Sequence, residues 1–112
     1  MKLEIAARAQ SGIDRAAADY FRDRPILGAD FLAEVDYSLA LLKRNPRLGH
    51  RVDATYRRIH LRRFPYSLLY RFDLEAQRIR ISVVGQQKRR PDFWRDRVEE
   101  ITPVYVRYAF AA

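Results

Sequence analysis

Residues 62–72 read RRFPYSLLYRF, and every even position from Phe64 to Phe72 carries a large apolar or aromatic side chain. Because successive side chains of a β-strand point to opposite faces of the sheet, this period of two predicts a strand with one buried face. The odd positions Ser67, Leu69 and Arg71 then lie on the other face. The stretch therefore predicts a sheet with one face in the core and the other open to solvent or to a partner.

The stretches on either side of this strand show the same alternation. Residues 56–63 and 78–84 alternate apolar with basic side chains, and connections of ordinary hairpin length join both to the central strand. The apolar positions predicted to face the core are Ile59, Leu61, Ile79, Ile81 and Val83. The sequence therefore predicts a meander of three antiparallel strands.

The first half of the chain is predicted to be mostly helical. Residues 2–6 alternate as a short strand, and Ser11 is predicted to cap a helix over residues 12–23. A second helix is predicted over residues 28–44, where apolar side chains recur at intervals of three and four. A strand, two helices and three antiparallel strands predict an α+β fold, with a helical hairpin packed on one face of the sheet.

Length and composition limit the class of protein. The chain has 112 residues, no cysteine and a formal net charge of +8, which favours an anionic partner and excludes disulfide or thiolate chemistry. No apolar run reaches the length of a signal peptide core or a membrane span. We therefore expect a single cytoplasmic domain over residues 1–112, with a core at 1–97 and a C-terminal extension at 98–112, and no membrane association.

Sites for cofactors or metals are not predicted. The sequence has no glycine-rich phosphate loop, and His50 and His60 lack acidic or cysteine companions at metal-binding spacing. A histidine in this setting is more often solvated or at the edge of a core than a metal ligand. We expect no cofactor and no metal.

The open face of the predicted sheet collects basic side chains. Its predicted members are Arg58, His60, Arg62, Arg71, Arg78 and Arg80. Charged residues on an exposed face are often only solvated, but like charges on adjacent strands repel, and hardly a carboxylate accompanies these. The excess favours an anionic partner over plain solvation.

The end of the chain carries a second basic cluster and an apolar tail. Pro91 is predicted to begin a short C-terminal helix that packs on the sheet, and alternating apolar side chains at 104–110 predict an ordered segment. The basic and aromatic positions around Pro91 are Lys88, Arg89, Arg90, Phe93 and Trp94. This cluster is either a solvated loop or an anchoring surface for a protein partner.

Three motifs in this order resemble those of a known family. RNPRLGHRV at 44–52, FPYSLLYRF at 64–72 and VVGQQKRRPDFWRDR at 83–97 resemble toxins of the ParE branch of the RelE/ParE superfamily, known from plasmid stabilisation systems. The resemblance implies a β-α-α-β-β-β fold and the toxin of a type II toxin–antitoxin system. An acidic ParD-like antitoxin would neutralise it in a hetero-oligomer, and operator DNA would be contacted only through that complex.

The resemblance also separates two activities. ParE-type toxins poison DNA gyrase, whereas RelE-type relatives cleave messenger RNA in the ribosome. Ser67, Gln86 and Gln87 stand where the nuclease branch has an arginine, a histidine and an arginine. We therefore predict no catalytic residue and expect gyrase inhibition. The alternatives are a RelE-type ribosome-dependent mRNA endonuclease and an inactive relative that only binds an antitoxin.

The predicted binding residues divide into two sets. The predicted antitoxin-binding residues are Arg58, His60, Arg62, Leu69, Arg71 and Arg80. The predicted target-binding residues are Lys88, Arg89, Arg90, Phe93 and Trp94.

Overall fold

The computed structural model of the chain describes residues 1–87. The predicted C-terminal helix, the boundary at residue 97, the extension at 98–112 and the five target-binding residues lie outside the described residues. Within the described range, seven elements follow one another along the chain. They are β1 (Lys2–Ile5), α1 (Ala7–Asp23), α2 (Pro25–Arg44), β2 (His50–Arg51), β3 (Arg57–His60), β4 (Tyr66–Asp73) and β5 (Arg78–Gln86).

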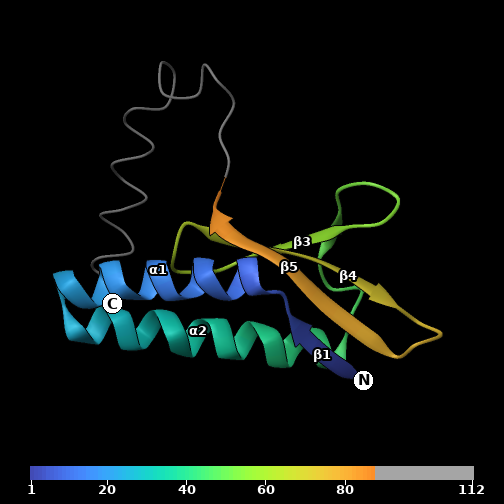
Figure 1. Cartoon of the computed structure of the whole chain (residues 1–112), viewed down its shortest axis with the longest axis horizontal. Coiled ribbons are helices and arrows are strands. Elements are labelled where there is room, and N and C mark those ends of the chain that lie inside the picture. Colours follow the sequence, from blue (N-terminus) through green and yellow to red (C-terminus); the bar gives the residue numbers. More distant parts are fainter. Residues whose placement is uncertain (88–112) are drawn as a thin grey trace, which may run out of the picture.

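The strands form one five-stranded sheet in the order β1-β5-β4-β3-β2, and the two helices form a hairpin beside it (Figure 1). The pairs β2–β3, β3–β4 and β4–β5 are antiparallel, which confirms the predicted meander. β1 pairs with β5 in parallel, so the sheet is mixed and not purely antiparallel. A parallel pair needs a long crossover, which everything from α1 to β4 supplies here. The α+β prediction is confirmed, and β2 is a short strand that the alternation did not predict.

Helix α1 begins at Ala7, five residues before the predicted start. Ser11 lies exposed inside the helix and does not cap it. The cap position is Ala6, whose backbone is extended and whose N–H donates to the carbonyl of Ile81 in β5. The sheet therefore sets the start of this helix, because Ala6, the residue between β1 and α1, is hydrogen-bonded to β5.

The predicted break between the helices is confirmed at Arg24, but α2 starts earlier than predicted. Pro25 occupies the first turn of α2, where its missing N–H has no intrahelical acceptor in any case. The proline therefore separates the two helices and at the same time begins the second one.

The core lies between the helical hairpin and the sheet. Phe64, Leu68 and Tyr70 are almost fully buried, while Tyr66 and Phe72 are partly buried against the same cluster, which confirms the predicted core face of the central strand. Aromatic rings fill one end of the core. The ring centroid of Phe31 lies 5.4 Å from those of Phe64 and Tyr66, at angles typical of edge-to-face packing.

An irregularity in β5 corrects one predicted core residue. Leu69 pairs with Val83, but the next residue, Tyr70, pairs with Ile81, so Ser82 is an extra residue in β5. An extra residue reverses the alternation beyond it. Val84 is therefore buried in the core, and Val83 lies on the open face, contrary to the prediction for Val83.

Helix α1 packs on β5 through its smallest side chains. Ala9, Ala16 and Ala17 are buried on this helix, and Gly12 lies among them. A Cβ placed on Gly12 would lie 2.1 Å from the carbonyl oxygen of Val84, a backbone atom that cannot turn away. The close approach of α1 to β5 therefore requires glycine at position 12.

Two buried polar side chains fix the connections at the ends of the strands. The hydroxyl of Tyr70 donates to the carbonyl of Pro46 at 2.7 Å and accepts the N–H of Gly49 at 2.8 Å, which holds the link between α2 and β2. Glu34 of α2 accepts the backbone N–H groups of Arg62 and Arg63, the latter at 3.1 Å, which holds the link between β3 and β4. Both interactions join segments that are far apart in the sequence.

We expect Gly12→Ala to lower the free energy of unfolding by about 1–3 kcal/mol, because the new methyl group forces α1 away from β5. The sign is informative, since glycine to alanine inside a helix otherwise stabilises by about 0.5–1 kcal/mol. Urea unfolding followed by circular dichroism measures the change. Gly85→Ala is the matched control, because a Cβ placed at position 85 would meet nothing within 4 Å. It should change stability by less than about 0.5 kcal/mol. A stabilised Gly12→Ala variant would contradict the close packing.

We expect Tyr70→Phe to cost about 1–3 kcal/mol of stability at neutral pH, because it leaves the buried Gly49 N–H without its acceptor. Burial raises the pKa of the Tyr70 phenol above its ordinary 10.0, against the smaller opposing effects of the Gly49 hydrogen bond and Arg57. The folded state therefore holds this proton longer than the unfolded state. The contribution of the Tyr70 hydroxyl to the free energy of unfolding is therefore complete below pH about 10, and it is lost as the pH rises through the folded-state pKa.

The wild type should accordingly lose stability faster than Tyr70→Phe above pH 10. Unfolding curves of both proteins between pH 8 and about pH 11 measure the difference. Parallel curves across that range would show that Tyr70 is not linked to folding in this way.

Candidate functional site

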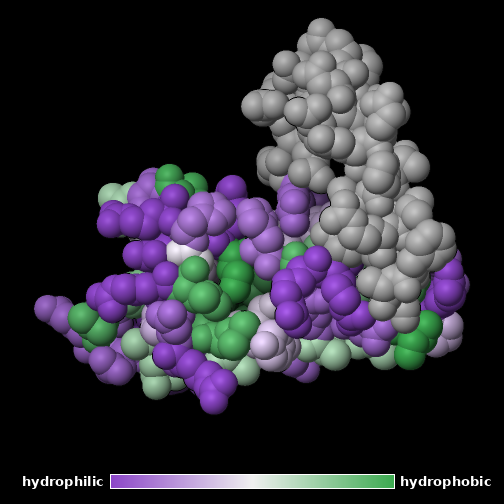
Figure 2. Space-filling view, turned by 180° about the vertical axis from the view of Figure 1, so that it is seen from behind, coloured by the Kyte–Doolittle hydropathy of each residue, from purple (hydrophilic) through white to green (hydrophobic). Residues whose placement is uncertain are grey.

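Two hollows lie on the sheet face that the helices leave open. The larger, here called the histidine groove, has a volume of about 780 Å³, and its lining residues are Arg58, His60, Ser67, Leu69, Val83, Gly85, Gln86 and Gln87. The smaller, here called the arginine cleft, has a volume of about 490 Å³, and its lining residues are Glu4, Ala54, Thr55, Arg71, Phe72, Asp73, Arg78 and Arg80. Seen from behind, hydrophobic surface lies in the middle of the described part, with hydrophilic surface on either side (Figure 2).

The strand register builds the histidine groove. Leu69 of β4 lies between Arg58 of β3 and Val83 of β5, and one step along the sheet Ser67 lies between His60 and Gly85. Partners across a ladder point to the same face, so these side chains share one surface. The extra residue Ser82 is what turns Val83 to this side. Leu69 and Val83 therefore form the apolar floor of the groove, and the basic residues Arg58 and His60 lie beside it.

His60 is tied into the groove. Its Nδ1 lies 2.6 Å from the Ser67 hydroxyl oxygen, so the two side chains share a hydrogen bond. The His50 ring centroid lies 5.4 Å from the ring of His60, which brings both histidines of the chain together. Among the lining residues, His60 carries an imidazole, the side chain that most often transfers protons in catalysis. Three or more side chains that could jointly hold a metal are not found among residues 1–87.

The predicted antitoxin-binding residues fall in three places. Arg58, His60 and Leu69 line the histidine groove, while Arg71 and Arg80 line the arginine cleft. Arg62 is on neither surface: its guanidinium lies 5.1 Å from the ring centroid of Tyr37 on α2. The prediction that Arg62 shares the open face is wrong, because β3 ends at His60 and the alternation does not continue through the turn held by Glu34.

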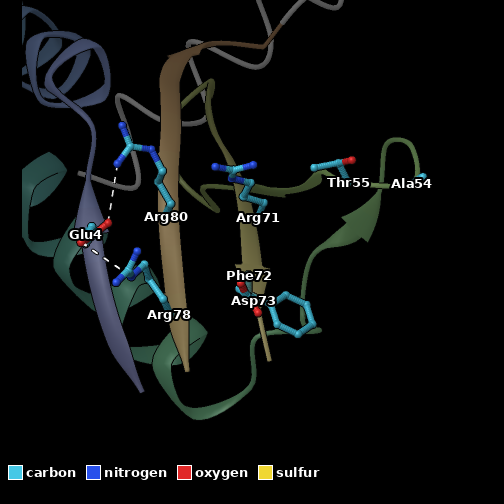
Figure 3. Close-up of a pocket in the computed structure, with 8 residues that line it drawn as sticks. All are labelled: Glu4, Ala54, Thr55, Arg71, Phe72, Asp73, Arg78 and Arg80. Atoms are coloured by element: carbon cyan, nitrogen blue, oxygen red, sulfur yellow. Dashed lines mark ion pairs between the residues drawn. The ribbon is translucent and has the colours of Figure 1, made fainter. Parts of the chain in front are cut away.

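The arginine cleft contains carboxylates that the sequence pattern did not place there. Glu4 of β1 lies 3.6 Å from Arg80 and 3.8 Å from Arg78, and Figure 3 shows both arginines reaching toward it. Asp73 is the ladder partner of Arg78. The expectation that hardly a carboxylate shares this face is therefore wrong. Glu4 was missed because only the parallel pairing of β1 with β5, across most of the chain, brings it there.

The three positions that distinguish the nuclease branch come together in the histidine groove. Ser67 lies near the start of β4 with 8% of its surface exposed, Gln86 is the last residue of β5, and Gln87 follows it. The backbone N–H of Gln87 donates to the Pro65 carbonyl at 3.0 Å, which fixes this end beside β4. The histidine groove is therefore the place where a toxin of the nuclease branch would have its arginine, histidine and second arginine. Neither Gln86 nor Gln87 can transfer protons.

Two observations limit the classes of site that residues 1–87 could form. Neither helix in this range is long and apolar enough to cross a lipid bilayer. Every fully buried side-chain nitrogen or oxygen in the range has a hydrogen-bond partner.

Comparison with solved structures finds toxins of the same fold. The chromosomal ParDE system from P. aeruginosa matches with a TM-score of 0.67 and 17% identity, over 79% of this chain and 97% of that chain. Isolated E. coli RelE matches with a TM-score of 0.62 and 20% identity, over 89% and 97%. The intact E. coli RelBE complex matches with a TM-score of 0.60 and 21% identity, over 79% and 98%. At these identities the likeness shows the fold.

Comparison with curated proteins finds no significant match, whereas comparison with protein families identifies a family. The model described as the ParE toxin of the type II toxin–antitoxin system parDE matches residues 3–91. This match covers β1 from its second residue and all of the other described elements. The chain belongs to the ParE toxin family of type II toxin–antitoxin systems.

Proposed function

We propose that an acidic ParD-like antitoxin neutralises this toxin by occupying the histidine groove. The observation that carries the proposal is the apolar floor of Leu69 and Val83 next to the guanidinium of Arg58. An amphipathic helix or strand with apolar and acidic side chains matches both features. The net charge of +8 would speed its approach.

The arginine cleft and Arg62 enter this proposal differently. An antitoxin segment would reach Arg71 and Arg80 only if it continued along the sheet beyond the groove. Arg62 would be reached only by a segment that also crosses α2, where its side chain covers Tyr37. We therefore place the core of the antitoxin contact at Arg58, His60, Leu69 and Val83.

We expect Arg58→Glu to weaken antitoxin binding by about tenfold or more, because it places a like charge against an acidic partner. Binding of the wild type should also weaken as salt rises from about 0.05 to 0.5 M, since salt screens these charges. Isothermal titration calorimetry with the co-encoded antitoxin measures both effects. Arg15→Glu is the matched control, because it makes the same charge change at an exposed position on α1. Equal effects of the two variants, or binding independent of salt, would contradict the proposal.

The free toxin is proposed to act on DNA gyrase. Cleavage of RNA by its own 2′-hydroxyl requires a general base, a general acid and stabilisation of charge at phosphorus. Ser67, Gln86 and Gln87 supply no proton-transfer group at the positions used by the nuclease branch. The proposal rests on this mismatch and on family membership. Lys88, Arg89, Arg90, Phe93 and Trp94 remain the proposed target contacts, because charge beside rigid aromatic side chains is typical of binding hot spots.

One observation favours the alternative of RNA cleavage. His60 lies in the same groove as Gln86 and Gln87 and next to Arg58, so a base and a phosphate-stabilising cation are both present there. A nuclease that uses His60 in place of the missing residues is the second candidate. An inactive relative that only binds an antitoxin is the third.

We expect the purified toxin to inhibit supercoiling by gyrase and to leave ribosome-bound mRNA uncut. Replacing Lys88, Arg89 and Arg90 together by alanine should weaken inhibition by about tenfold or more. His60→Ala should leave inhibition within about twofold, since a residue outside the proposed target contacts has little effect on binding. Supercoiling assays, and primer extension on translated mRNA, measure the two activities.

The three candidates give different outcomes in these assays. Cuts in ribosome-bound mRNA that disappear in His60→Ala would replace the gyrase proposal by the nuclease. Normal growth on expression of the wild type without antitoxin, with no effect in either assay, would identify an inactive relative.

A further inference from the structure

The arginine cleft brings three guanidinium groups together at the end of the open face away from the histidine groove. Arg78 and Arg80 are two residues apart on β5 and point to the same side. Arg71 of β4 is the direct ladder partner of Arg80. In Figure 3 the Arg71 side chain lies between Arg80 and Thr55, and Thr55 borders the cleft on the far side.

The charges in the cleft are only partly balanced. Glu4 lies 3.6 Å from Nη1 of Arg80 and 3.8 Å from Nε of Arg78, which are ion-pair distances too long for hydrogen bonds. Arg71 forms no ion pair within residues 1–87. Directly opposed like charges on neighbouring strands are destabilising, and Arg71 faces Arg80 in this way. N–H groups of Arg71 and Arg80 therefore remain available to an anion placed between them.

The chemistry of the cleft suits a phosphate better than a carboxylate. A guanidinium donates two parallel hydrogen bonds to oxyanions of either kind. A carboxylate offers two oxygens and one charge. Glu4 already places one carboxylate at the side of the cleft. A terminal phosphate offers three oxygens and carries a charge of about −1.5 to −2 as a monoester, whereas a backbone phosphodiester offers two free oxygens and one charge, as a carboxylate does. A terminal phosphate could therefore accept hydrogen bonds from both guanidiniums at once. The volume of about 490 Å³ leaves room for a nucleotide-sized group.

We propose that the arginine cleft binds the terminal phosphate of a nucleotide. Arg71 and Arg80 hold the phosphate oxygens, while Glu4 remains paired with Arg78. Neither the antitoxin proposal nor the gyrase proposal requires this site, since their residues lie in the histidine groove and at 88–94. The cleft gives the toxin a contact with a nucleotide that does not depend on its antitoxin.

Calorimetric titration of the full 112-residue chain tests the proposal at about 150 mM NaCl, where weak surface attraction is screened. The probes are pyrophosphate, ATP, a short single-stranded DNA and a glutamate-rich peptide of equal charge. We expect saturable binding of phosphate probes, weakened about tenfold or more by Arg71→Ala, because a charge-assisted hydrogen-bonding partner is lost. Glu4→Gln should strengthen binding, because it removes the competing carboxylate. Circular dichroism checks that each variant is folded.

Arg15→Ala is the matched control, because it removes one exposed arginine on α1, outside both hollows. It should leave phosphate binding within about twofold, as expected for an exposed charge outside the site. Saturable binding of pyrophosphate and ATP, lost in Arg71→Ala and kept in Arg15→Ala, supports the proposal. It is overturned by equal losses in the two variants, by binding of the oligonucleotide alone, by no phosphate binding, or by equal binding of the glutamate peptide. The last result would give the cleft to an acidic protein partner.

Discussion

The single extra residue in β5 sets both the core and the open face of this toxin. Ser82 shifts the pairing between Leu69 and Tyr70, so that Val84 turns under α1 and Val83 turns outward. Without it, Val83 would face the core and the groove would lose half of its apolar floor. The carbonyl of Val84 also lies where α1 approaches most closely, at Gly12. Packing of the helix and formation of the groove therefore depend on one irregularity.

Buried hydrogen bonds complete the frame around that sheet. Tyr70 holds the segment before β2 and Glu34 holds the turn after β3, in each case through backbone groups. Such partners keep buried polar atoms satisfied, and the free energy of unfolding falls when one is removed. Because β3 lies between these two connections, its open-face residues Arg58 and His60 are held in place from both ends.

The open face is divided, which has a consequence for function. Its histidine groove combines apolar and basic surface with a histidine–serine hydrogen bond, whereas the arginine cleft combines opposed arginines with one bridging carboxylate. An extended partner needs apolar contact to bind tightly, and a small oxyanion needs converging donors. One sheet face of a ParE-family toxin thus carries two chemically different hollows, which we propose bind different partners.

The sequence by itself determined the α+β class, the helical hairpin, the meander and the buried face of β4, because these follow from local periodicity in Phe64 to Phe72 and from the break at Pro25. Its motifs also determined the family. Tertiary structure decided what local patterns cannot encode. The start of α1 at Ala7 depends on a hydrogen bond to β5, and the outward turn of Val83 depends on a shift in register. Glu4 joins the arginine cleft through a parallel pairing that spans most of the chain, and Arg62 leaves the open face because its strand ends before it. Each of these depends on contacts between residues distant in sequence, which a period of two or of 3.6 does not specify.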